Sequence, residues 1–427
     1  MSFTKLLILL LLLAADLVAQ SNERYSRAPI SYGEAGVEGP LERLLARLEG
    51  GGETLALDEN FGYLPALLGA LQIPASSQML VFSKTSLQAD RIGPRTPRAI
   101  YFGDDVYVGW VPGSKVLEIS SMDPVQGPLF YTLTQPREGS AQIERGRGQC
   151  LACHGGSQTQ GWPGNLVRSV QPDPQGRPLL KLGTRFVDHR TAFEDRWGGW
   201  YVSGTHGEQR HQGNAVVGPE QEEVDRSAGA NLTDLAGHFD TELYLSPHSD
   251  LVALMLLEHQ AEMHNILARA SYEVRLAMAR DIQYRKIFEE PAGGVRPGTK
   301  RLIDQHATRI LDYLLFKAEA VLTEPIAGTS GFAAEFTAAG QRDSKQRSLK
   351  ELDLQTRLLR YPCSYLIYSP AFDALPAPLL EVVYAELLTI LQGAPAFDEH
   401  IRLSLPTRRA ILEILLDTKP TLPEGWR

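Results

Sequence analysis

Residues 98–113 of the 427-residue chain read RAIYFGDDVYVGWVPG and decide the fold class of its first half. β-Branched and aromatic residues dominate 99–102 and 106–111, and the intervening GDD at 103–105 is typical of a turn between two strands. Further short runs of this kind, bounded by Gly- and Pro-containing turns, lie at 79–83, 116–120 and 129–133. Their regular spacing predicts an antiparallel meander.

The second half of the chain has a different sequence pattern, which is typical of helices. Ser246 followed by Pro247 fits a helix start, with Ser as N-cap and Pro at the first helical position. Helices are predicted at 64–71, 249–281, 301–322, 352–359, 379–391 and 407–416, and further strands at 166–170, 179–182 and 200–203. The sequence therefore predicts an α+β protein: a β-rich N-terminal unit at 21–245 and an all-helical unit at 246–427.

The first twenty residues read MSFTKLLILLLLLAADLVAQ, with Lys5 before an apolar run and the small residue Ala19 near its end. This pattern predicts a signal peptide at 1–20 and an exported, periplasmic protein. The alternative is an uncleaved anchor, although Asp16 shortens the apolar run. No other stretch is apolar enough to span, so no stable membrane span is expected once the signal is removed.

Composition narrows the function classes. The chain has 42 Lys and Arg against 51 Asp and Glu, a net charge of −9, and no basic block, so nucleic acid is not an expected partner. Hydrophobic residues make up 43% of the sequence, which indicates an ordinary globular protein rather than a disordered one.

The chemistry-bearing stretch is CLACH at 150–154, which has the C-x-x-C-H form of a c-type haem attachment site. The two-residue spacing lets Cys150 and Cys153 each form a thioether with a haem vinyl group. His154 follows at once and can place an imidazole nitrogen on the iron, which imidazole suits well. We predict one covalent haem c with His154 as the proximal axial ligand.

Three other uses of these residues stay open. A thioredoxin-like dithiol needs C-x-x-C at a helix start after a strand in a βαβ context, whereas here a Gly- and Arg-rich loop precedes the pair. A structural zinc site needs four ligands, and no second C-x-x-C or H-x₃₋₅-H pair lies nearby. A disulfide between Cys150 and Cys153 would close too short a loop to stabilise much. Export favours haem, because covalent haem attachment takes place there.

On these residues the chain resembles single-haem periplasmic c-type cytochromes, specifically bacterial proteins with a cytochrome c domain. The similarity lies in CLACHG at 150–155 and extends more weakly through 98–113, 197–214 and 258–265. The resemblance implies haem binding and electron transfer. Small helical cytochromes supply a distal Met after the motif, whereas here the first Met downstream is the remote Met255. A β-rich haem c sensor domain of PAS-like shape resembles the layout better.

The distal side of the iron has four candidate ligands, in the order His206, His259, His211 and Met263. Two glycines flank His206 closely and permit a close backbone approach. His259 and Met263 are i,i+4 neighbours on one face of a predicted helix. The alternatives are a solvated loop around His206 and a helix that turns its polar stripe, His259 included, to water.

Other side chains are expected around the porphyrin. The cationic candidates for the haem propionates are Arg145, Arg147 and Arg168. The aromatic candidates for covering the ring are Trp162, Trp197 and Trp200. Cys363 is expected to be a buried, inert thiol.

The sequence thus predicts an exported c-type cytochrome that transfers one electron through Fe(II)/Fe(III) and meets a redox partner protein. The runner-up is a haem c-based sensor or small-ligand-binding protein with an exchangeable sixth position. A peroxidase-like haem enzyme comes third, so catalytic activity stays open.

Overall fold

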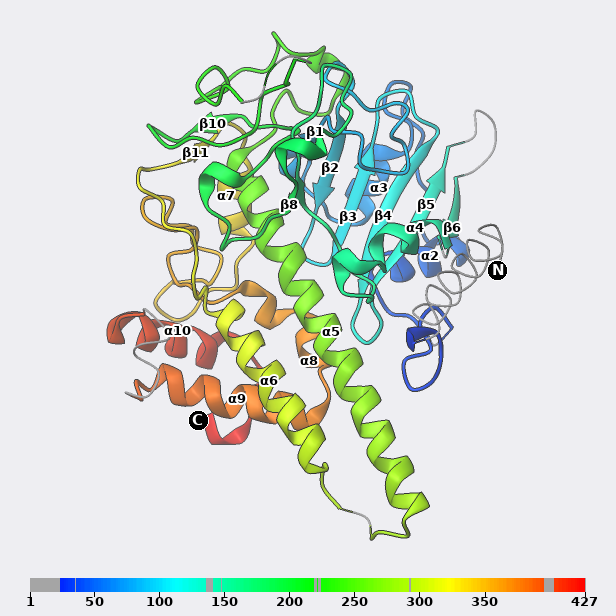
Figure 1. The fold of residues 1–427 in the computed structure, drawn as a ribbon, viewed down its shortest axis with the longest axis vertical. Helices are drawn as coiled ribbons and strands as arrows, with labels where there is room; N and C mark the ends of the chain where they lie inside the picture. The colour runs from blue at the N-terminus through cyan, green and yellow to red at the C-terminus, as the bar shows by residue number, and fades with distance from the viewer. Residues whose placement is uncertain are drawn as a thin grey trace, which may run out of the picture.

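The structure is a computed structural model that describes residues 24–34, 36–135, 141–146, 148–218, 221, 224–291, 293–394 and 403–426. The signal peptide predicted at 1–20 lies outside the described residues. A large sheet forms one side of the molecule, and a long helix, α5 (Leu251–Ile287), runs from beside the sheet into a group of helices (Figure 1).

Seven strands form one antiparallel sheet in the order β6-β5-β4-β3-β2-β1-β9. They are β1 Met79–Val81, β2 Arg98–Phe102, β3 Val106–Trp110, β4 Val116–Asp123, β5 Gly127–Thr134, β6 Gln142–Arg145 and β9 Trp200–Tyr201. The predicted meander is confirmed, because each of the first six strands pairs with its neighbour in sequence. The sequence did not indicate β6, which is rich in polar residues, nor the pairing of β9 with β1.

The sheet is covered on both faces. Alternate side chains such as Leu80, Tyr101 and Val108 join the core formed with α2 (Pro40–Glu49) and α3 (Leu64–Ala70). The opposite alternation, including Met79, Phe102 and Tyr107, joins the core that surrounds α5. The period of two along each strand accounts for this division.

Helices dominate the chain after residue 250, as predicted. They are α5 Leu251–Ile287, α6 Pro297–Leu314, α7 Phe332–Ala338, α8 Pro370–Asp373, α9 Ala377–Leu391 and α10 Leu405–Thr418. This half also contains the two-residue strand β11 (Ala327–Gly328), which pairs with β10 (Gly204–Thr205). The α+β class is confirmed, with one small strand interrupting the helical half. One hydrophobic core joins sheet residues to helices from α5 to α10.

Four local predictions were wrong, one of them the end of the helix predicted at 301–322, which stops at Leu314. No helix forms at 352–359, because the Asp353 carboxylate accepts hydrogen bonds from Gln355 N and Thr356 N and so stabilises a turn. The strand predicted at 179–182 is a 3₁₀ turn at Leu180–Leu182, and the short pair β7 (Arg168–Ser169) and β8 (Arg185–Phe186) forms instead around it.

The start of α5 is the fourth correction. Ser246 does not cap the helix; Asp250 does, since its Oδ1 accepts hydrogen bonds from Val252 N at 2.9 Å and Ala253 N at 3.1 Å. Its Oδ2 accepts from Thr329 N and Ser330 N, each at 2.9 Å. One buried carboxylate therefore joins the start of α5 to a segment about 80 residues later.

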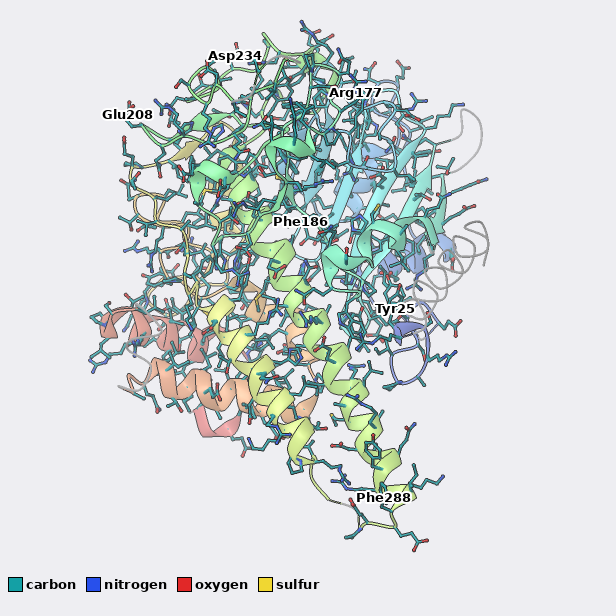
Figure 2. The ribbon with its side chains drawn as sticks, in the orientation of Figure 1. Tyr25, Arg177, Phe186, Glu208, Asp234 and Phe288 are labelled. Carbon is teal, nitrogen blue, oxygen red and sulfur yellow. The ribbon has the colours of Figure 1, made fainter. Side chains whose placement is uncertain are left out.

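The later part of α5 leaves the core. Its first half is almost wholly buried, whereas Phe288, just past its end, is 64% exposed and lies far from the sheet (Figure 2). None of the described helices combines the length and the apolar composition needed to cross a membrane.

Replacing Asp250 by Ala should lower the free energy of unfolding by about 3 kcal/mol, because it removes the N-cap and leaves buried N–H groups without acceptors. Urea denaturation followed by circular dichroism measures the change. Asp90→Ala, at an exposed position, is the control and should change stability by less than about 0.5 kcal/mol. Equal losses in the two variants would contradict the role given to Asp250.

Candidate functional site

The C-x-x-C-H residues occupy a short helix, α4 (Gly148–His154), which follows β6 directly. The carbonyl of His154 accepts a hydrogen bond from Gly164 N at 2.8 Å, and its ring Nδ1 lies 2.9 Å from Gly164 O. A carbonyl oxygen only accepts, so Nδ1 carries the proton and Nε2 has the free lone pair. His154 is thus in the tautomer that binds a metal through Nε2.

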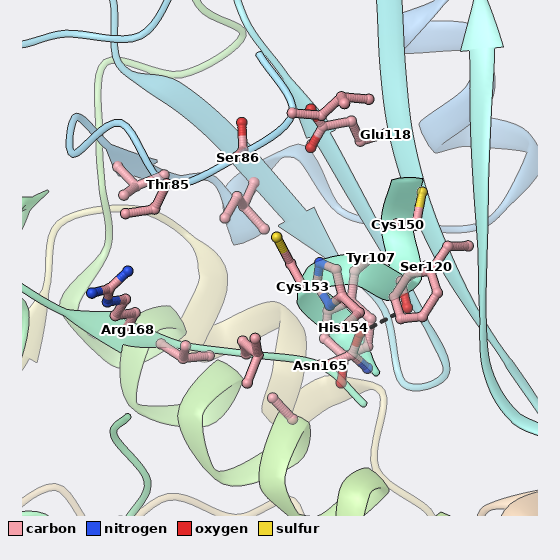
Figure 3. A pocket seen from close by; sticks show the side chains of 18 of the residues that line it. Thr85, Ser86, Tyr107, Glu118, Ser120, Cys150, Cys153, His154, Asn165 and Arg168 are labelled. Carbon is pink, nitrogen blue, oxygen red and sulfur yellow. Dashed lines mark hydrogen bonds between the residues drawn. The ribbon is translucent and has the colours of Figure 1, made fainter. Parts of the chain in front are cut away.

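The loop that holds His154 is itself anchored to α5. Asn265 Oδ1 accepts from Asn165 N at 2.7 Å, and Asn265 Nδ2 donates to Asn165 O at 2.8 Å. Ser120 of β4 donates to Asn165 Oδ1 at 2.8 Å (Figure 3). The long helix and the sheet together fix the position of the Gly164 carbonyl.

Cys150, Cys153 and His154 line one cavity of 730 Å³ between α4, the sheet and α5. In Figure 3 the Cys153 sulfur is directed into the hollow between α4 and the segment that carries Thr85 and Ser86. The apolar part of the lining includes Val81, Ile100, Phe130, Val167, Phe186, Trp200, Leu257 and Ala261. Cofactor pockets in proteins have volumes of about 300–1,000 Å³ and mostly apolar walls.

Two charged side chains of the sheet also line the cavity. Arg98 of β2 and Glu118 of β4 form an ion pair in which each side chain is less than 20% exposed. Gly109 of β3 makes room for it, because a Cβ there would lie within 2.7 Å of the Arg98 guanidinium. The sequence did not single out this pair; the signal was an Arg in β2 and a Gly in β3, two strands whose other residues are apolar or aromatic.

Burial and this ion pair set the protonation of the motif. Burial lowers the pKa of His154, and the Arg98 charge lowers it further, which favours the neutral imidazole. Burial, with the Glu118 charge adding to it, raises the pKa of Cys150. A neutral imidazole beside two thiols is the donor set that a c-type haem needs.

The observations fit a haem. The cavity is large enough, much of its lining is apolar, and Cys150, Cys153 and His154 all line it. Within the described residues, no group of three or more His, Cys, Asp and Glu side chains is arranged to hold a metal ion. All three cysteines are free thiols in the structure.

The distal candidates lie elsewhere. His206 is buried, with Nδ1 2.8 Å from Gln209 O and Nε2 accepting from Asn231 N at 2.9 Å. His211 packs against His206, with ring centroids 4.7 Å apart. Neither lines the cavity, so the structure does not bring either to His154.

His259 is likewise committed to other partners. Its Nδ1 lies 2.8 Å from Nδ1 of His189, and its Nε2 lies 2.7 Å from Ser364 Oγ. Neither His259 nor the buried Met263 lines the cavity. The structure therefore does not support His206 or His259 as the sixth ligand in this conformation.

One alternative for His259 was that the polar stripe of α5 faces water. The structure shows that this stripe is buried. Glu258, His259 and Gln260 are all 0% exposed. Glu258 pairs with the equally buried Arg196 at 2.9 Å, and Arg196 also donates to Thr191 O. Burial raises the pKa of Glu258 to about 7, with the Arg196 charge opposing that shift.

Of the Arg and Trp side chains expected around the porphyrin, some line the cavity and some do not. Arg168 and Trp200 line the cavity. Arg145 instead donates to Gly33 O, Trp162 and Trp197 are buried away from the cavity, and Arg147 lies outside the described residues. Cys363 is buried, and burial raises its pKa to about 12, as befits an inert thiol.

No protein-family model matches this chain, and searches of curated proteins and of solved structures also find no match. The resemblance to c-type cytochromes and to PAS-like haem sensors therefore stays a prediction, carried by the residues themselves.

The buried histidines predict a specific loss of stability in acid. Burial lowers the pKa of His189, His206, His211 and His259 below 6.5, and that of His211 to about 3. The unfolded chain takes up protons that the folded one excludes, so stability is complete above pH 6.5 and falls as the pH drops toward 3.

His211→Asn keeps an acceptor for Gly213 N but cannot be protonated. Relative to its own stability at about pH 7.5, this variant should lose about 2 kcal/mol less than the wild type at about pH 5. Urea titrations at both pH values measure the difference, with His248→Asn, at a partly exposed position, as the control. The same pH effect in wild type and His211→Asn would contradict the assignment.

Proposed function

We propose that this chain is an exported c-type haem protein with one haem attached through Cys150 and Cys153 and bound at its iron by His154. The observation that supports this most is that these three side chains line a single 730 Å³ cavity, with His154 already held in the metal-binding tautomer. Export follows from the signal pattern at 1–20, because the attachment chemistry takes place outside the cytoplasm.

A bound haem supplies a one-electron couple between Fe(II) and Fe(III). The chain's own residues orient and insulate it. Gly164 O fixes the His154 ring, and the apolar wall that includes Val167 and Phe186 excludes water. Arg98 and Arg168 are the cavity's cations and suit the propionate carboxylates.

A second observation favours an exchangeable sixth position. His154 is the only His among the described residues that line the cavity, and no Met or Lys accompanies it there. The two lining tyrosines are engaged, Tyr107 with His264 and Tyr131 with Glu42. This composition favours a haem that binds a small ligand or senses one over a purely electron-carrying haem closed by two protein ligands.

Exchange of electrons with a partner protein stays part of the proposal. Cys153 is solvent-exposed and Cys150 is half-buried, so one edge of the site is accessible from outside. A partner could approach this edge without passing through the protein core.

The double variant Cys150→Ala, Cys153→Ala should lose covalent haem completely, because no thioether can form. Haem staining of a denaturing gel and intact-protein mass spectrometry of protein from the periplasm measure this. Cys363→Ala is the matched control: its thiol is buried away from the cavity, and the variant should keep the haem. Haem retained by the double variant, or a wild-type mass that shows bare thiols, a cystine or zinc, would overturn the proposal.

The reduced protein should bind carbon monoxide, because among the described residues that line the cavity no His other than His154, and no Met or Lys, competes for the sixth position. The visible spectrum of the reduced protein with and without the gas measures this. His206→Asn and His259→Gln should bind it as the wild type does. A low-spin reduced spectrum that carbon monoxide leaves unchanged would show a protein ligand at that position and favour plain electron transfer.

A further inference from the structure

A buried hydrogen-bond network leads from the cavity wall into α5. The ring of Tyr107 lines the cavity near His154 (Figure 3), and its hydroxyl oxygen lies 2.8 Å from His264 Nδ1. Gln260 Nε2 donates to the same hydroxyl oxygen at 3.1 Å, and Tyr365 donates to Gln260 Oε1 at 2.7 Å. All four side chains are less than 10% exposed.

The donors fix where the protons are. The Gln260 amide nitrogen can only donate, so the Tyr107 oxygen accepts from it. The Asp105 carboxylate on the other side of the His264 ring can only accept, which favours the tautomer with its proton on Nε2 and makes the Tyr107 hydroxyl the donor to Nδ1. His264 in its neutral form then carries its proton on Nε2. The network is therefore directional, with the imidazole as the acceptor of the tyrosine proton.

The other side of the His264 ring faces a carboxylate. Its Nε2 lies 3.5 Å from Asp105 Oδ1, and neither atom has a hydrogen-bond partner among the described residues although both are buried. His264 is 0% exposed, whereas the Asp105 side chain is 19% exposed. Asp105 thus connects a fully buried imidazole to the surface.

The charges around His264 come from each neighbouring element. The turn between β2 and β3 supplies Asp104 and Asp105, and Lys350 holds the Asp104 carboxylate at 2.7 Å. On α5 the titratable neighbours are Glu262, two residues away, and His259, which interacts electrostatically with His264 and whose pKa is lowered well below 6.5, mainly by burial and then by the charge of its partner His189. Asp105 is therefore the charge best placed to stabilise a proton on His264.

We propose that His264 takes up one proton when the iron of the cavity is reduced, and releases it when the iron is oxidised. This rests on the proposed function. The electron comes from a reduced one-electron carrier and stays on the iron, changing Fe(III) to Fe(II). The proton comes from solvent by way of Asp105 and forms a bond to the imidazole, so that one negative and one positive charge enter together.

The physical reason is charge balance in an apolar site. An added electron is poorly screened in a cavity with low-dielectric walls, so it raises the proton affinity of a buried base nearby. Once His264 is charged, both of its ring nitrogens donate, and Nδ1–H then donates to the Tyr107 oxygen. The Tyr107 hydroxyl hydrogen has to turn away from His264, so the hydrogen bond between these two side chains reverses with the redox state.

Redox titration of the full haem-loaded chain between about pH 5 and about pH 9 tests this. At a fixed applied potential the ratio of reduced to oxidised protein should rise about tenfold for each unit of falling pH, over the range in which reduction is accompanied by proton uptake. His264→Gln should flatten this dependence. Asp105→Asn should move it to lower pH, because the imidazolium loses its carboxylate. His238→Gln, remote from the network, is the control and should titrate as the wild type does.

The outcomes separate the two proposals. Absence of covalent haem from the wild-type protein would overturn the proposed function and this inference with it. If the wild type carries haem and His264→Gln keeps the wild-type pH dependence, the inference alone is overturned. The same holds if Asp105→Asn shows its pH dependence over the same pH range as the wild type. Asp105 lies in a turn and is partly exposed, so its variant tests the relay even if His264→Gln fails to fold.

Discussion

The start of α5 and its N-cap Asp250 are almost wholly buried, and the helix there carries the polar residues Glu258, His259, Gln260 and His264. Buried polar groups must be paired, since each unpaired one costs about 1–3 kcal/mol. The partners come from every other part of the fold: Arg196 from the loops before β9, Tyr107 from the sheet and Ser364 from the helical half. The need to pair the buried polar groups of this helix therefore determines how the two halves of the chain pack.

The candidate site depends on the same helix. Asn265 holds the loop whose Gly164 carbonyl orients His154, and His264 holds the hydroxyl of Tyr107 at the cavity wall. Leu257 and Ala261 complete the lining. The reactive groups of the cavity thus lie on α4, and the residues that hold them in place lie on α5. A structural change in the helical half can therefore alter the site without direct contact with α4.

Features encoded over a few residues could be predicted from the sequence, and features that depend on distant partners could not. The period of two in 98–113 gave the meander, and five adjacent residues gave the motif. The cap at Asp250 was missed because Ser246 and Pro247 offered a second local start signal, and the contacts of its other carboxylate oxygen with Thr329 and Ser330 lie too far along the chain to predict. Arg98 was missed because its importance lies in its pairing with Glu118 across the sheet.

The candidates for the distal side of the iron could not be ranked from the sequence for a related physical reason. The C-x-x-C-H motif marked His154, whereas His206 and His259 were candidates for the distal side only. Both of these have both ring nitrogens in hydrogen bonds inside the core. Recruiting either would break one of these bonds and leave a buried partner unsatisfied. His154 has one nitrogen anchored to a carbonyl and the other facing the cavity. A ligand is distinguished by this asymmetry, which only the folded structure reveals.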